Sequence, residues 1–358
     1  MPEIRKLDID TPALLIDLDR MEHNIKKMAS FFDMQFSNLR PHTKTHKCPV
    51  LAHKQLQAGA QGITCAKLGE AEVMAAAGIR DILIANQIVG PDKIARLANL
   101  ARHCDIMVAV ESRHNVADLS MAARHAGSTI RILIEVDVGM HRCGVKSPEE
   151  AVSLAQKILE SPGLQFEGIM GYEGHAVMIP ELDDRRQACL KSMQVLIGAR
   201  DALLKSGIEV KIVSAGGTGT YNIAGSYPGV TEIQAGSYIL MDAKYRSVLQ
   251  DFESALTILS TVTSRPDKET AILDAGMKAM TFEFGMPELV GVAGAAVSFL
   301  SEEHGHLYLE DADPQVGEKV ELIPSHCCTT INLHDRFYAV RGDRLEAVWS
   351  VAGRGKFA

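Results

Sequence analysis

The feature that most constrains the fold of this chain is a regular alternation of short apolar segments with longer amphipathic segments. Between about residue 37 and residue 240, eight strand-like segments are each followed by a helix-like segment or by the start of one. The strand-like segments are 38–40, 62–65, 81–85, 105–110, 130–136, 166–172, 209–213 and 232–234. They look apolar on both faces, as the covered strands of a parallel sheet are. The pattern predicts an α/β fold, a (β/α)8 TIM-type barrel.

The sequence changes character after Tyr245. Short strand-like segments separated by turn residues replace the alternation, and long helix-like segments are absent. These segments are 256–261, 269–273, 290–297, 307–310, 319–323, 336–340 and 346–351. This predicts an all-β second domain, which we expect the strand-like segment 13–17 to join. The expected domains are therefore a barrel over 18–246 and a β-domain formed by 1–17 and 247–358.

Composition excludes several classes of partner. The net charge of −8 gives no support to binding of nucleic acid or of an anionic membrane. The N-terminus lacks the apolar core of a signal peptide, and no apolar stretch is long enough to span a bilayer. Seven cysteines at irregular positions, without an export signal, indicate a reducing compartment. We expect a cytoplasmic protein.

The run Arg40-Pro-His-Thr-Lys-Thr-His-Lys47 follows the first expected barrel strand. In a (β/α)8 barrel, the loops after the strands build the active site. Positive charge around Lys44 favours the neutral amine, which is the form that makes an imine with a carbonyl compound. On composition alone, a solvated basic loop is an equally good interpretation.

Further polar and glycine-rich segments follow the later strands. Arg142 comes after the fifth strand between Gly139 and Gly144, and Tyr172 comes after the sixth. Glycine-rich loops follow the seventh strand, at 214–220, and the eighth, at 234–238. Barrels of this kind commonly bind phosphate there through backbone N–H groups. One such loop is weak support, but two of them together with a lysine and an arginine form a much more specific pattern.

These segments together resemble the pyridoxal 5′-phosphate (PLP) enzymes of fold type III, the alanine racemase-like barrels. Within that group they resemble the D-threonine aldolase and D-serine dehydratase-like family. The resemblance covers nearly the whole chain. It is carried by 11–13, 40–49, 135–139, 142–145, 216–219, 234–238, 274–278, 303–305, 324–326 and 332–335.

The resemblance implies a role for each matching residue. Lys44 matches the lysine that forms the Schiff base with PLP, Arg142 the arginine beside the phenolic oxygen, and Tyr172 the tyrosine near the pyridine ring. The residues expected to bind or neighbour the phosphate are Gly217, Thr218, Gly219, Gly236, Ser237 and Tyr238. The aldolase branch carries a histidine six residues beyond the tyrosine, where this chain has Met178, and the nearby His175 could serve as the base instead. The expected catalytic residues are Lys44, Tyr172 and His175.

A metal position is expected at His326 and Cys328. On a strand, residues i and i+2 project to the same side, and an imidazole beside a thiolate suits zinc. From spacing alone, a buried cysteine pair beside a surface histidine is the commoner outcome. The resemblance makes this the family's divalent-metal position. Zinc or manganese is expected there, with magnesium as a further candidate.

The resemblance implies a PLP- and metal-dependent lyase acting on β-hydroxy-D-amino acids, as a homodimer. The overall similarity favours the D-threonine aldolase type, which cleaves its substrate to glycine and an aldehyde. The pair His326 and Cys328 instead follows the His-x-Cys pattern of the dehydratases, whereas the aldolases typically show His-x-Asp. A D-serine or D-3-hydroxyaspartate dehydratase, releasing a keto acid and ammonia, is therefore the alternative. An amino-acid racemase would need a second acid–base residue, and a non-catalytic PLP-binding protein is usually a barrel alone.

Overall fold

The computed structural model describes residues 4–358 of the chain, which pack into two compact units. The barrel unit comprises residues 28–44, 51–236 and 356–358. The sheet unit comprises residues 4–27, 45–50 and 237–355. The packing thus assigns 18–27, 45–50 and 237–246 to the sheet unit, although the sequence-based division placed them in the barrel. That division stays a prediction, and residues 1–3 of it lie outside the described part of the chain.

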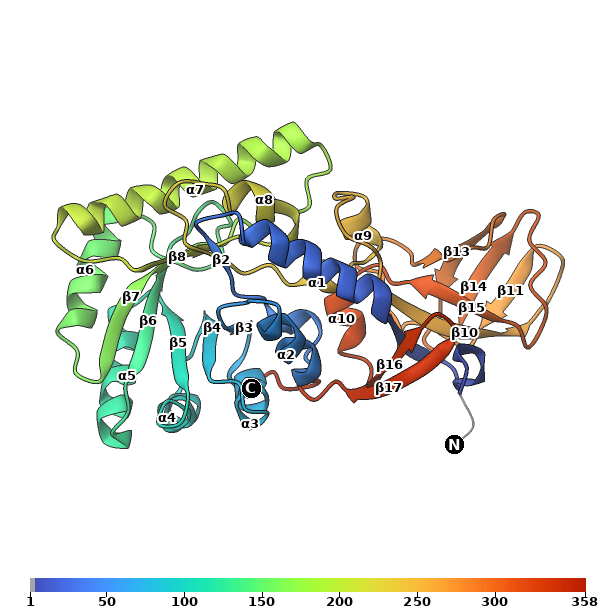
Figure 1. Cartoon of the computed structure of the whole chain (residues 1–358), viewed down its shortest axis with the longest axis horizontal. Helices are drawn as coiled ribbons and strands as arrows, with labels where there is room; N and C mark the ends of the chain where they lie inside the picture. The colour runs from blue at the N-terminus through green and yellow to red at the C-terminus, as the bar shows by residue number, and fades with distance from the viewer. Residues whose placement is uncertain (1–3) are drawn as a thin grey trace. The chain divides into compact units, whose positions relative to one another are not determined.

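The barrel unit is built on a parallel sheet (Figure 1). Within the described residues the sheet has eight strands, in the order β2-β9-β8-β7-β6-β5-β4-β3. A parallel bridge between His42 and Thr64 joins the two ends of this order and closes the barrel. The strands are β2 (Asn38–Leu39), β3 (Ile63–Cys65), β4 (Asp81–Gln87), β5 (Asp105–Val110), β6 (Ile130–Glu135), β7 (Leu164–Met170), β8 (Ile212–Ala215) and β9 (Glu232–Ile233). The expected (β/α)8 barrel is confirmed.

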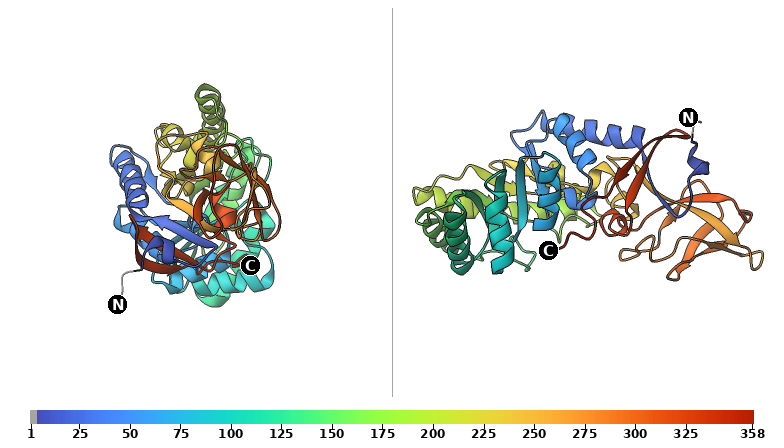
Figure 2. Two further views of the ribbon diagram at one scale, coloured as in Figure 1. Left: turned by 90° about the vertical axis from the view of Figure 1, so that its right-hand side faces the viewer. Right: turned by 90° about the horizontal axis from the view of Figure 1, so that it is seen from below.

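Helices alternate with these strands along the chain, and those that lie within the barrel unit line the outside of its sheet (Figures 1 and 2). The helices within the barrel unit are α3 (Leu68–Ala76), α4 (Pro91–Leu100), α5 (Arg113–Ala126), α6 (Pro148–Leu159), α7 (Leu182–Lys205) and α8 (Tyr221–Ala224). Helices α1 (Leu18–Phe32) and α2 (Pro49–Gln57) each have residues in both units. Local sequence explains where some of them begin. The hydroxyl of Ser147 accepts a hydrogen bond from the Glu150 N–H at the start of α6, and Pro148 occupies the first helical position. These two features explain why α6 begins at Pro148.

The sheet unit contains a mostly antiparallel sheet that both ends of the chain build. Strand β1 (Ala13–Asp17) pairs antiparallel with β10 (Leu256–Ser264) and parallel with β16 (Arg336–Arg341). The N-terminal strand therefore joins the C-terminal strands, as its composition suggested. The remaining strands are β11 (Thr270–Leu273), β12 (Glu288–Leu289), β13 (Ala295–Leu300), β14 (Gly305–Leu309), β15 (Lys319–Ile323) and β17 (Arg344–Ser350).

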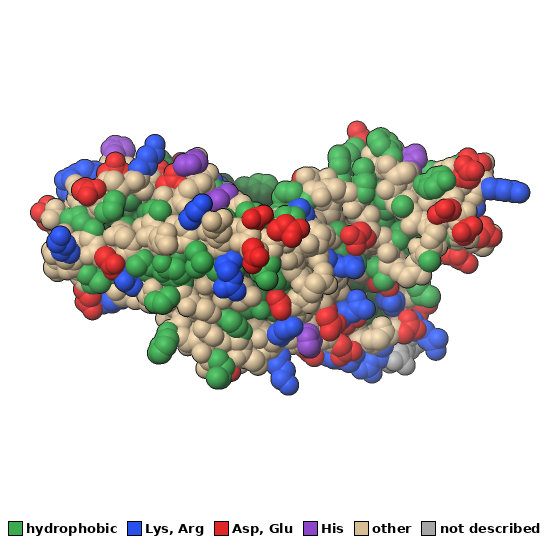
Figure 3. Space-filling model, turned by 90° about the horizontal axis from the view of Figure 1, so that it is seen from above, with side chains coloured by type: hydrophobic (Ala, Val, Ile, Leu, Met, Phe, Trp, Pro, Cys, Tyr) green, Lys and Arg blue, Asp and Glu red, His purple; other side chains and the backbone are tan. Residues whose placement is uncertain are grey.

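The short helix α10 (Cys327–Ile331) lies among the strands of the expected all-β domain, and the short helix α9 (Ala243–Arg246) precedes that domain within the same unit. Both begin beside the side chain of Asp242, and this position matters for the candidate metal site below. Within residues 4–358, no helix is both long and apolar enough to cross a membrane. Acidic and basic side chains are interspersed on the face shown in Figure 3, so that face presents no large patch of a single charge.

Candidate active site

Lys44 lies in a short 3-10 turn, Thr43–Thr45, just beyond the end of β2. The hydroxyl of Thr43 donates to the carbonyl oxygen of Thr64 on β3, at 3.0 Å, and so holds the turn at the mouth of the barrel. Thr43, Thr45 and His46 are almost completely buried, and Lys44 is half-buried. The interpretation of this run as a solvated basic loop is therefore wrong, because most of its side chains are buried.

Arg40, at the start of the same run, is neutralised inside the barrel. Its guanidinium is completely buried, with Nε 2.6 Å from Oε2 of Glu232 and Nη1 2.7 Å from Oδ1 of Asp81. A buried cation needs such partners, because desolvation would otherwise cost several kcal/mol. Arg40 therefore has a structural role, and it adds no net positive charge around Lys44.

Tyr172 is the point at which the loops of the barrel mouth converge. The Nζ atom of Lys44 lies 5.7 Å from the centre of the Tyr172 ring, and the Cζ atom of Arg142 lies 5.8 Å from it. A Cβ atom built on Gly217 would lie 3.3 Å from Cε2 of the same ring. The loops after β2, β6 and β8 thus bring three of the predicted site residues to the ring of the fourth, Tyr172, which lies in the loop after β7. Both cations lie within the range of cation–π attraction.

Arg142 is held at this position by a carboxylate from the end of β6. Its Nη2 atom lies 3.8 Å from Oε1 of Glu135, whose other oxygen accepts a hydrogen bond from Gln87 at 2.5 Å. Burial raises the pKa of Glu135, although the bond from Gln87 and the charge of Arg142 oppose that rise. The side chain of Arg142 is 52% exposed, so its guanidinium can still bind an anionic group of a ligand.

The glycine-rich loop after β8 packs closely against the loop after β7. A Cβ atom on Gly219 would overlap the carbonyl oxygen of Val177, so only glycine fits at this position. Thr218 and Gly219 lie in a 3-10 turn, Thr218–Thr220, whose residues are buried. Lys44 offers an amine for an imine, Arg142 offers a cation for an anionic oxygen, and this loop carries backbone N–H groups, the kind of donor that binds phosphate. These residues fit PLP.

Two residues of the loop after β9, Ser237 and Tyr238, belong to the sheet unit. Tyr238 is buried, and its ring centre lies 5.6 Å from that of Phe252, which shows a packing role. The hydroxyl of Ser237 lies 3.9 Å from Sγ of Cys328. Gly236 belongs to the barrel unit. The cofactor roles expected for Gly236, Ser237 and Tyr238 stay predictions.

His175 lies beside α7. It is exposed, and its Nε2 atom lies 3.4 Å from the hydroxyl of Ser192 on α7. A Cβ atom on Gly139 would lie 3.3 Å from the imidazole, so the ring also borders the loop after β6. Its role as a catalytic base stays a prediction.

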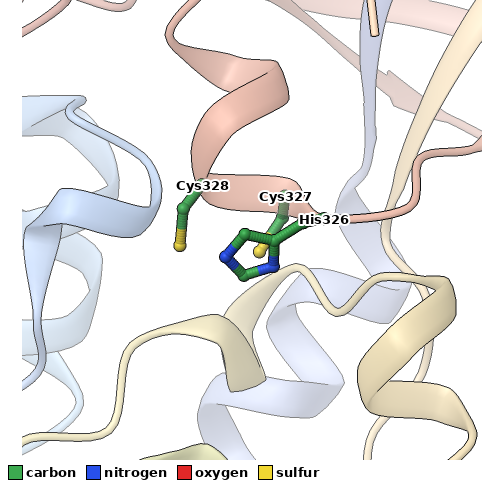
Figure 4. Close-up of side chains that lie close together, drawn as sticks. All are labelled: His326, Cys327 and Cys328. Atoms are coloured by element: carbon green, nitrogen blue, oxygen red, sulfur yellow. The ribbon is translucent and has the colours of Figure 1, made fainter. Parts of the chain in front are cut away.

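The candidate metal ligands lie at the start of a helix, so the expectation that they lie on a strand is wrong. His326 is the residue before α10, and Cys328 is the second residue of that helix. The helix begins here because a carboxylate oxygen of Asp242 accepts the N–H of Cys327, at 2.9 Å, as a negative group at a helix N-terminus does. The imidazole and both sulfur atoms nevertheless lie together, with one potential ligand atom of each residue within 4.8 Å of the others (Figure 4).

Asp242 also orients the candidate imidazole ligand. It is completely buried, and its Oδ2 atom lies 2.8 Å from Nδ1 of His326. A proton on Nδ1 donates to this carboxylate and leaves Nε2 as the nitrogen that can bind a metal, the arrangement usual for metal-binding histidines. Burial alone would lower the pKa of His326, but Cys328 and Asp242 raise it to about 11.

The two sulfur atoms differ in their surroundings. Cys327 is completely buried, and burial together with Cys328 raises its pKa well above the ordinary value of a thiol. Cys328 is half-buried, and its Sγ lies 3.5 Å from the hydroxyl of Thr45, which follows Lys44 in the chain. An imidazole with a neighbouring thiolate is a donor set that suits zinc. The residues present therefore fit a divalent metal, with Cys328 the better thiolate ligand.

The comparisons with known proteins agree with this fold. The family model of the alanine racemase N-terminal domain matches residues 16–244, and that of the serine dehydratase domain matches residues 255–340. The chain belongs to the alanine racemase-like family of PLP enzymes, fold type III, as its barrel and the lysine at the barrel mouth also indicate.

Several of the similar proteins within this family are lyases. The chain is 39% identical to D-threonine aldolase from Arthrobacter sp., over 97% of this chain and 93% of that protein. The crystal structure of D-threonine aldolase from Filomicrobium marinum matches with a TM-score of 0.97 and 38% identity, over 99% of this chain and 98% of that one. D-threo-3-hydroxyaspartate dehydratase from Delftia sp. HT23 matches with a TM-score of 0.90 and 30% identity, over 97% of this chain and 99% of that one.

Proposed function

We propose that this protein is a PLP- and divalent-metal-dependent lyase of the D-threonine aldolase type. It would cleave the Cα–Cβ bond of a β-hydroxy-D-amino acid to give glycine and an aldehyde. The observation that supports this best is the convergence of Lys44, Arg142 and Gly217 on the ring of Tyr172. The full-length similarity to an aldolase supports the choice of reaction.

Each residue of the barrel mouth has a task that its surroundings allow. The bound cofactor supplies an electron sink for the charge that develops at Cα when a bond to it breaks. The amine of Lys44 would hold the cofactor, and the half-exposed guanidinium of Arg142 would bind one of its anionic oxygens. The ring of Tyr172 packs beside both cations, and the loop after β8 takes the phosphate.

The metal would be held by Nε2 of His326 and Sγ of Cys328. A divalent ion held there would supply a Lewis acid, which would lower the pKa of the substrate's β-hydroxyl. The nitrogen and sulfur donors favour zinc over the harder manganese and magnesium. Asp242 keeps the imidazole in the tautomer that such a ligand needs.

A dehydratase that acts on D-serine or D-3-hydroxyaspartate is the second candidate. The His-x-Cys pair favours it, because this is the pattern that the sequence resemblance assigns to dehydratases. The match to the dehydratase from Delftia over nearly the whole chain supports it as well. In that reaction the same metal would assist the loss of the β-hydroxyl group rather than its deprotonation.

Product analysis distinguishes these candidates. The purified protein, loaded with PLP and zinc or manganese, is incubated separately with D-threonine, D-serine and D-3-hydroxyaspartate. We expect glycine and acetaldehyde from D-threonine. Keto acid and ammonia as the main products would favour the dehydratase, and the L-enantiomer would indicate a racemase. Turnover that survives complete removal of metal by EDTA would exclude the proposed metal role.

We also propose that the protein acts as a homodimer in the cytoplasm. Light scattering of the purified holoenzyme tests the first point, and a monomer that retains full activity would contradict it.

A further inference from the structure

Glu173 is a buried carboxylate that joins two loops of the barrel mouth. It follows Tyr172 directly in the loop after β7, and it is completely buried. Its Oε1 atom accepts the hydroxyl hydrogen of Thr220, at 2.6 Å, and its Oε2 atom accepts the N–H of Gly216, at 3.2 Å. One side chain thus bonds to both ends of the glycine-rich loop after β8.

A chain of hydrogen bonds continues from this carboxylate into the loop itself. The hydroxyl of Thr220 accepts the N–H of Gly217, at 3.3 Å, while it donates to Glu173. Between these two residues lie Thr218 and Gly219, which the cofactor phosphate is expected to meet. The conformation of the loop therefore depends on an acceptor at the position of Glu173.

Packing alone gives little reason for a carboxyl group at this position. The hydrogen-bond donors that hold it, Thr220 and Gly216, are neutral, and Sγ of Cys189 lies 3.9 Å away. Burying an ionised group among neutral partners is costly, and an apolar side chain of similar volume is often as stable or more stable in such a place. Burial raises the pKa of Glu173, although the bonds from Thr220 and Gly216 oppose that rise.

We propose that Glu173 is a positioning residue that sets the conformation of the loop 216–220 for the phosphate of PLP. Because Glu173 is adjacent to Tyr172, it also ties that loop to the segment that carries the ring beside Lys44. The inference rests on the proposed function, since it takes PLP as the cofactor. It goes beyond the proposed function because it assigns a role in phosphate binding to Glu173, a residue that need not contact the cofactor.

The test compares two cofactors that differ only in phosphate. Apoprotein is titrated with PLP and, separately, with pyridoxal, and imine formation is followed by visible absorbance. Glu173→Gln keeps the size of the side chain but replaces one acceptor oxygen with a donor. We expect this change to weaken PLP binding about ten-fold or more, because a buried N–H or hydroxyl then lacks its acceptor. Pyridoxal binding should stay within about two-fold of the wild type.

Glu70→Gln is a matched control. Glu70 is also buried, and its carboxylate accepts the N–H groups of Ala66 and Lys67 in the loop after β3. It should leave the ratio of the PLP and pyridoxal affinities unchanged. Thr220→Val removes the hydroxyl link and should reproduce the selective loss, whereas Thr220→Ser should restore PLP binding. These two variants also test the inference if Glu173→Gln does not fold.

Each outcome bears on a defined claim. Equal weakening of PLP and pyridoxal would show a general structural role and overturn the inference, as would an unchanged PLP affinity in both Glu173→Gln and Thr220→Val. In these cases the proposed function would stand, because the wild-type protein still binds PLP. Failure of the wild-type protein to form an imine with PLP would instead overturn the proposed function, and this inference with it.

Discussion

The candidate cofactor site and the candidate metal site are built in opposite ways. In the barrel unit, Lys44, Arg142, Tyr172 and Gly217 come from four separate loops, and the closure of the barrel brings them to one ring. In the sheet unit, the donor atoms come from three consecutive residues at the start of α10. The first arrangement follows from the topology of the whole unit, and the second from the capping of one short helix.

A fully buried carboxylate supports each of the two sites. Glu173 accepts hydrogen bonds from the loop that is expected to bind phosphate, whereas Asp242 accepts one from a candidate metal ligand itself. Substitution of Glu173 should therefore change cofactor binding indirectly, through the conformation of a loop. Substitution of Asp242 should change metal binding through the orientation of one imidazole ring. The two sites can be tested separately, because each has its own spectroscopic or binding signal.

The largest effect should follow removal of the amine at the barrel mouth. Lys44→Ala should abolish the visible absorbance of the cofactor imine and lower kcat by at least ~10³-fold, as loss of a covalent catalytic group does. Lys67→Ala is the control, since Lys67 is an exposed lysine just after β3. An imine band that persists in Lys44→Ala at wild-type intensity would show that another amine holds the cofactor.

Removal of the metal should have the next largest effect and should leave the cofactor signal intact. Dialysis against EDTA, or the change Cys328→Ala, should lower turnover of D-threonine by about 10²-fold or more, because a Lewis acid contributes several kcal/mol. The imine absorbance should not change. Loss of the imine absorbance together with turnover would contradict the expectation that the cofactor site does not depend on the metal site.

Loss of the carboxylate behind His326 should have a moderate effect on metal affinity. Asp242→Asn should weaken zinc binding by roughly 10–100-fold, as changes to such supporting partners do. Competition with a chromophoric chelator measures this directly. Asp274→Asn is the control, because Asp274 accepts hydrogen bonds from Ser260 and Thr261 in the same unit. Zinc affinity that is equal in the two variants would mean that Asp242 only caps helices.

The smallest effect should be a pH dependence of stability at Glu173. Its pKa is raised above the ordinary value of 4.5, so the folded protein holds this proton more tightly than the unfolded chain does. The stabilisation is complete below pH 4.5 and is lost as the pH rises through the pKa of the folded state. The free energy of unfolding of the wild type, relative to Glu173→Gln, should therefore fall by about 1.4 kcal/mol for every pH unit that separates the folded-state pKa from the unfolded-state pKa. Denaturation at several pH values measures it, and a difference that grows with pH would show that the pKa is lowered.

The sequence predicted the part of the structure that depends on short-range pattern. Strand β5 has the bounds expected from the alternation of apolar segments. The position of Lys44 followed from the rule that barrel chemistry lies at the ends of strands. The burial of Arg40 in the same run did not follow, because the carboxylates that neutralise Arg40 lie 41 and 192 residues further along the chain.

Long-range hydrogen bonds explain what the sequence could not predict. A strand was expected at 326–328, but Asp242, 84 residues before His326, starts a helix there instead. The partners of Glu173 lie 43 and 47 residues away. Neither Asp242 nor Glu173 belongs to a local sequence motif, so the roles of these two carboxylates can be inferred only from the folded structure.

The pairing of β1 has a consequence for how this protein is made. Leu15 and Ile16 lie opposite Tyr338 and Ala339 on β16, so an apolar strand near the N-terminus must wait for partners from the far end of the chain. At roughly 5–20 residues per second of synthesis, that wait lasts about 15 to 65 seconds on the ribosome. During this time the whole barrel sequence is synthesised, while β1 has no partner strand to pair with. The segment 13–16 is therefore the place where a nascent or truncated chain would be expected to recruit chaperones or to aggregate.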